Sequence, residues 1–161
     1  MKKVMLLGLL PLFISSGNIK PLEVCYEETI IKLKPKHIQP ITKDGDLLNA
    51  LIFVESRGND SAIGDRHLVG NEAVGALQIR PIMVREVNRI CKLIGSHQRF
   101  TLKDRFDREK SIHMFRIWKE FHHKDSSPEK VARNWNGGPK GYKRDRTIKY
   151  WNKIEKQLNN E

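Results

Sequence analysis

The residue best suited to proton chemistry in this sequence is Glu55, a carboxylate directly behind the apolar run 51–54. Water solvates a carboxyl group poorly at the end of an apolar helix, which raises its pKa and keeps it protonated near neutral pH. A protonated carboxyl is what a general acid needs to donate a proton to a leaving oxygen. The simpler alternative is a solvent-exposed glutamate at a helix end, which Glu55 by itself does not exclude.

Three segments carry the other distinctive residues of the sequence: 55–59 (ESRGN), 73–81 (AVGALQIRP) and 134–139 (NWNGGP). The stretch between the first two contains several glycines and is long for a loop inside a compact helical domain. Such a segment is expected to build a site or a small hairpin.

The remaining sequence must position these segments, and from about residue 43 onward its apolar spacing is helical. The spacing predicts helices over about 44–55, 81–94, 101–121, 126–135 and 148–158. Thr101 and Asp104 resemble a capping box for the third of these helices. That helix is expected to bury Phe106, Met114, Ile117, Trp118 and Phe121. The sequence therefore predicts a mainly α single domain, with a glycine-rich loop or small hairpin between its first two helices.

Taken together, in this order and at these distances, the three segments resemble the soluble-type lytic transglycosylase domain, which has a lysozyme-like fold. The resemblance covers roughly residues 44–155. It implies cleavage of the β-1,4 bond between MurNAc and GlcNAc in peptidoglycan, with a 1,6-anhydro product. The expected partner is therefore the glycan strand of the bacterial cell wall.

The resemblance also implies roles for individual residues. Glu55 would be the catalytic acid and base, and Ser56 would help to set the site beside it. Gly75 would let the backbone approach the sugar, and Gln78 would reach into the cleft. Asn136 would line the opposite wall.

Two departures from the family pattern are visible. Ala76-Leu77 stands where the family has Leu-Met, a mild change to the cleft floor, and the second departure is at position 135. Trp135 stands where the family has a tyrosine, so a phenolic hydroxyl expected near the acid is lost. The indole keeps a single N–H donor. Trp135 is expected either to bind substrate or to pack in the core.

Two other functions remain open. A lysozyme-type hydrolase needs a second carboxylate to activate water. Asp65 is the better candidate, ahead of Asp60 and Glu72, although we favour a turn role for Asp65, paired with Arg66 or capping a loop. The third possibility is a non-catalytic basic protein that binds the wall or nucleic acid, but no nucleic-acid-binding motif is visible.

The N-terminus indicates export. A basic start, an apolar run over 4–14 and small residues at 15–17 form the layout of a secretory signal peptide. We expect a signal peptide at 1–17, an extended arm at 18–42 and the transglycosylase domain at 43–161. The protein would act in the periplasm or outside the cell as a monomer, with no transmembrane segment in the mature chain.

The formal net charge of +11 favours an anionic partner. With export, the cell wall is a better candidate than nucleic acid, and no specific nucleic acid is expected. The two cysteines, Cys25 and Cys91, could pair outside the cytoplasm or remain separate thiols. They do not have metal-ligand spacing, so we expect neither a metal nor a cofactor.

Overall fold

The computed structural model describes residues 43–159, and this part of the chain is mainly helical. It contains α2 (Lys43–Ser56), β1 (Ile63–Gly64), β2 (Ala73–Val74), α3 (Pro81–Leu93), α4 (Arg108–His123), α5 (Pro128–Gly137) and α6 (Ile148–Leu158). Three 3-10 turns complete it: η1 (Lys103–Phe106), η2 (Gly141–Lys143) and η3 (Asp145–Thr147). The predicted mainly α class is confirmed. The expected signal peptide, the arm and Cys25 lie outside the described residues.

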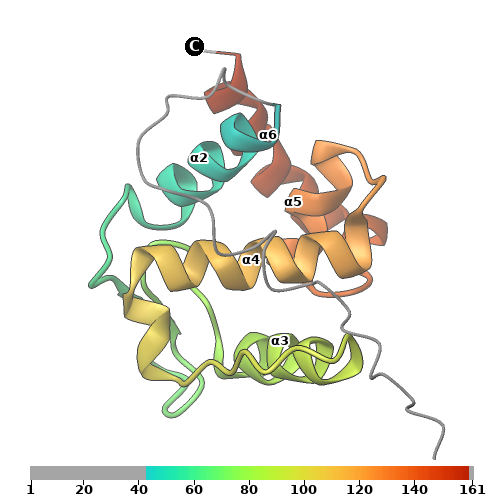
Figure 1. The fold of residues 1–161 in the computed structure, drawn as a ribbon. Helices are drawn as coiled ribbons and strands as arrows, with labels where there is room; N and C mark the ends of the chain where they lie inside the picture. The colour runs from blue at the N-terminus through green and yellow to red at the C-terminus, as the bar shows by residue number, and fades with distance from the viewer. Residues whose placement is uncertain (1–42, 160–161) are drawn as a thin grey trace, which may run out of the picture. The chain divides into compact units, whose positions relative to one another are not determined.

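The helices pack in pairs around one core. α2 packs against α6, α3 against α4, and α5 against α6 (Figure 1). Burial of apolar side chains from every one of these helices drives the packing. The core includes Leu51, Leu77, Val87, Met114 and Ile154, each at most 1% exposed.

α2 is the most apolar of these helices, and its sequence explains its place. Leu47, Leu48, Leu51 and Ile52 are buried, and they anchor the helix so that its C-terminal turn carries Glu55. The helix ends immediately after Ser56, because Arg57 adopts a left-handed backbone with φ of 53°.

A two-stranded antiparallel sheet connects α2 to α3. Ile63 pairs with Val74 and Gly64 with Ala73. A tight turn follows at 75–78, where Val74 bridges to Ile79. Pro81 then starts α3 in the first-turn position that proline favours.

The third helix starts later than predicted. Thr101 does bond to the Asp104 carboxylate, through its backbone N–H at 2.7 Å and its hydroxyl at 2.9 Å. This cap opens only the short turn η1, and α4 begins at Arg108 behind a second cap, Asp107. As a result Phe106 and Phe121 are 40% and 44% exposed, so their predicted burial is wrong.

Within residues 43–159, no helix has both the length and the apolar character needed to cross a membrane. Cys91 on α3 is buried and its thiol is free.

Candidate active site

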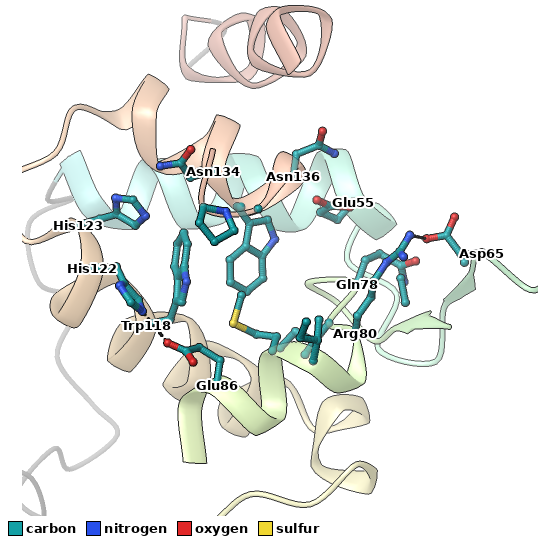
Figure 2. A pocket seen from close by; sticks show the side chains of 18 of the residues that line it. Glu55, Asp65, Gln78, Arg80, Glu86, Trp118, His122, His123, Asn134 and Asn136 are labelled. Carbon is teal, nitrogen blue, oxygen red and sulfur yellow. Dashed lines mark hydrogen bonds and ion pairs between the residues drawn. The ribbon is translucent and has the colours of Figure 1, made fainter. Parts of the chain in front are cut away.

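A cleft of about 1010 Å³ is lined by residues of α2, the hairpin segment, α3, α4 and α5. Its lining includes Glu55 from α2, Asp65 and Gln78 from the hairpin segment, and Trp135 and Asn136 from α5 (Figure 2). Residues far apart in the sequence therefore meet in one cavity.

Glu55 occupies this cleft with its carboxyl group largely removed from water. The pKa of Glu55 is raised to about 7, and burial is the largest cause. The hydrogen bond from Tyr150 lowers the pKa, the Asp65 charge raises it and the Lys153 charge lowers it. The net shift has the direction that the sequence predicts. Near neutral pH the group is therefore divided between its protonated and ionised forms, as a residue that both donates and accepts a proton requires.

The closest polar partner of Glu55 is Tyr150, which sequence reasoning missed. The Tyr150 hydroxyl donates a hydrogen bond of 2.7 Å to Glu55 Oε1. Burial raises the pKa of the Tyr150 phenol well above its usual value, and the Glu55 charge adds to this, so the hydroxyl keeps its proton. A phenolic hydroxyl thus lies beside the acid, supplied by α6 and not by position 135.

A signal for Tyr150 was present in the sequence. It precedes Ile154 by four residues, so it shares the buried face of α6. A tyrosine on a buried face needs a partner for its hydroxyl. What the sequence could not supply was the packing of α6 on α2, which brings that hydroxyl to Glu55.

Ser56 holds the end of α2 to the turn at 75–78. Its hydroxyl donates to the carbonyl of Ala76 at 2.8 Å and to the carbonyl of Ile52 at 3.3 Å. Ser56 does not line the cleft. It therefore fixes the position of the neighbouring Glu55 from outside the cleft.

Gly75 has a different role from the one that the resemblance implies. It is buried, has φ of 77° and does not line the cleft. A Cβ there would lie 1.9 Å from the carbonyl oxygen of Arg105. The close approach that requires glycine is therefore to the backbone of η1, not to a sugar.

Gln78 lines the cleft but is held by the protein. Its side-chain amide donates to the carbonyl of Gly75 at 3.0 Å and to that of Ala62 at 3.4 Å. Its backbone is left-handed, with φ of 48°. Such strain in a residue other than glycine persists only where the surroundings enforce it, and it gathers at functional sites.

Asp65 lines the cleft near Glu55, also with a left-handed backbone at φ of 50°. Its carboxylate forms an ion pair with Arg80, at the start of α3 (Figure 2). The expected pairing with Arg66 is wrong, because the Arg66 side chain donates to the carbonyl of Ile63 instead. Arg80 thus links the hairpin segment to α3 and pairs with the acid whose charge acts on Glu55.

Neither a protein-family model nor a curated protein matches this chain. Its function must therefore be argued from the geometry of the cleft.

Two tryptophans form the apolar middle of the cleft. Trp118 and Trp135 lie edge to face with ring centroids 5.1 Å apart, and Trp135 makes a similar contact with Phe115. Trp135 therefore packs against the core and also lines the cleft. Asn136 lines the cleft from the end of α5 and is exposed.

A separate cluster closes the far end of the cleft. His122 on α4 bonds to the carboxylate of Glu86 on α3 at 2.7 Å (Figure 2). Glu86 also accepts two bonds from Arg89. The bonds from Arg89, then the one from His122, lower the pKa of Glu86 to about 2. Glu86 is therefore ionised at any physiological pH and cannot act as an acid.

The remaining candidate acids lie outside the cleft lining. Asp60 pairs with Arg108 at 2.9 Å, and Glu72 accepts a bond from the backbone of Gly70 at 3.0 Å. Among residues 43–159, no group of three or more metal-ligating side chains is arranged to hold a metal ion.

Proposed function

We propose that the protein is a peptidoglycan lytic transglycosylase with a lysozyme-like fold, exported to the periplasm or cell exterior. The observation that carries the proposal is the Glu55–Tyr150 pair, a carboxyl group with a pKa of about 7 in a long cleft. Such a carboxyl is suited to donate a proton to a glycosidic oxygen and to take one back.

In the first step Glu55 protonates the oxygen that links MurNAc to the next GlcNAc, and the bond from that oxygen to C1 of MurNAc breaks. The acetamido group of MurNAc stabilises the positive charge left on the sugar. In the second step the Glu55 carboxylate accepts the proton of the MurNAc 6-hydroxyl while its oxygen attacks C1. The product is a 1,6-anhydro end, and no water is consumed.

The intramolecular attack explains why one carboxyl group is enough. A hydroxyl on the same sugar has a very large effective concentration, on the order of 10⁵ M or more in favourable geometries. Tyr150 supports both steps: its hydrogen bond occupies Oε1, which leaves the other oxygen to carry the proton. The same bond stabilises the carboxylate formed after the first transfer.

The state of Asp65 favours a transglycosylase over a hydrolase. A hydrolase that inverts the configuration at the anomeric carbon needs a free carboxylate to deprotonate water. Asp65 is instead held in an ion pair with Arg80. That ion pair holds the carboxylate in place and restricts its reach.

Product analysis tests the proposal. Purified peptidoglycan strands are incubated with the protein, and the fragments are identified by mass spectrometry. Anhydro ends are expected, and these are lighter by one water than the reducing ends that a lysozyme leaves. Reducing ends would instead assign hydrolysis, and the absence of any fragment would overturn the enzymatic proposal.

A further inference from the structure

The C-terminal part of the described chain carries an unusual concentration of positive charge. Between residues 43 and 139 the lysines and arginines outnumber the acids by four, whereas between 140 and 156 they outnumber them by five. We call the seven cations of this short segment the basic surface: Lys140, Lys143, Arg144, Arg146, Lys149, Lys153 and Lys156.

The cations of the basic surface have no ion-pair partner in the part of the chain that the structure describes. All seven residues are exposed, and none of them forms an ion pair within residues 43–159. By contrast, Arg80, which precedes α3 and lines the cleft, and Arg89 on α3 each pair with an acid. Seven exposed cations against two acids in 17 residues repel one another, which favours the binding of an anionic partner.

The helix geometry places part of the basic surface beside the catalytic pair. Lys149, Lys153 and Lys156 follow at intervals of four and three residues, so they share one face of α6. Tyr150 is one residue after Lys149, a rotation of roughly 100° around the helix. The stripe of lysines therefore runs alongside the face that carries Tyr150 to Glu55.

Two further contacts connect the basic surface to the cleft. Arg146 lines the cleft itself. Lys153 is close enough to Glu55 for its charge to act on that carboxyl group. An anion bound here is therefore attached to, or adjacent to, the molecule in the cleft.

We infer that the basic surface binds the carboxylate-bearing peptides of the same strand whose glycan lies in the cleft. This inference rests on the proposed function, since it names peptide-substituted peptidoglycan as the substrate. The basic surface is continuous with the cleft at Arg146. This favours the peptides of the bound strand over a separate anionic polymer, because such a polymer would compete with the strand for the space around Arg146. The surface thus selects strands that still carry peptides over strands from which they have been removed.

The test neutralises three cations that neither line the cleft nor act on Glu55. The variant combines Lys143→Gln, Lys149→Gln and Lys156→Gln in the full chain. The matched control combines Lys92→Gln, Lys103→Gln and Arg116→Gln, three exposed residues without an ion pair that do not line the cleft. Both are assayed on intact strands and on strands whose peptides an amidase has removed.

On intact strands the variant should lose about tenfold in kcat/KM at low salt, since each exposed pair contributes modestly. On strands without peptides the variant should have the same kcat/KM as the parent. The control should have the parent's kcat/KM on both substrates. Equal loss on both substrates, or no loss on intact strands, would overturn the inference.

A binding arm separates this inference from the proposed function. The same substitutions are introduced with Glu55→Gln, and co-sedimentation with insoluble peptidoglycan is measured without cleavage. Weaker binding that depends on the peptides supports the inference even if the parent releases no fragments. Binding that falls when a phosphate-containing wall polymer is extracted, and not when the peptides are removed, assigns the surface to that polymer and overturns the inference.

Discussion

Glu55 and Glu86 line the same cleft, yet their surroundings move their pKa values in opposite directions, to about 7 and about 2. Glu55 is buried at the end of an apolar helix, with a neutral phenol as its donor. Glu86 is more exposed and receives bonds from the Arg89 guanidinium and from His122. The difference shows that the number and charge of the donors, together with access to water, decide which carboxyl group can transfer a proton.

The largest expected effect separates the two carboxyl groups directly. Glu55→Gln should lower the rate of peptidoglycan cleavage by about 10²–10⁴-fold or more, because it removes the proton donor at nearly constant shape. Glu86→Gln should keep most of the activity. The rate of fragment release from peptidoglycan measures both, and parental activity in Glu55→Gln would disprove the assignment.

Tyr150→Phe should have the next largest effect. Loss of a hydrogen bond to a carboxylate costs about 1.5–3 kcal/mol, which corresponds to roughly 10–100-fold in rate. Because that bond lowers the pKa of Glu55, its removal should also move the basic limb of the kcat/KM profile above pH 7. An unchanged basic limb would show that the phenol does not act through Glu55. Tyr142→Phe, an exposed tyrosine that does not line the cleft, is the control.

Asp65→Asn should change the rate by only a few fold, since the proposed reaction activates no water. The Asp65 charge raises the pKa of Glu55, so the basic limb should move to lower pH. Lys153→Gln should move it to higher pH, because that charge lowers the same pKa. A loss of about 10²-fold or more in Asp65→Asn, with reducing-end products from the parent, would point to a lysozyme.

The smallest expected effect is on thermal stability. Replacement of Glu55 and replacement of Glu86 should change Tm in opposite directions. The folded pKa of Glu55 is raised, so its contribution to stability is complete below about pH 4.5 and lost as the pH rises past about 7. Glu55→Gln should therefore raise Tm relative to the parent at pH 8 but not at pH 4.

The folded pKa of Glu86 is lowered, so its contribution is present above about pH 4.5 and lost as the pH falls toward 2. Glu86→Gln should lower Tm slightly at pH 7, with the difference disappearing near pH 2. Thermal unfolding across this range measures both variants. The same sign for both at pH 8 would contradict the opposed environments.

Apolar spacing was sufficient to predict the helical class and the place of Glu55 behind an apolar run, of which Leu51 and Ile52 are buried. It could not predict which side chains meet across the fold. Arg80 pairs with Asp65 of the hairpin segment, and Tyr150 of α6 bonds to Glu55. Both pairings depend on tertiary packing. Gly75 was predicted from the resemblance to face a sugar, but it packs against η1, which lies thirty residues further along the chain. The sequence alone could not show that contact.

The bond between Glu55 and Tyr150 joins residues 95 positions apart. Closing a loop of that length is slow compared with forming local helices, so this contact is expected to form late in folding. A chain still emerging from the ribosome lacks α6 until almost all of the described residues have been made. The Glu55–Tyr150 pair therefore forms only after almost all of the described residues have been made and α6 has packed on α2.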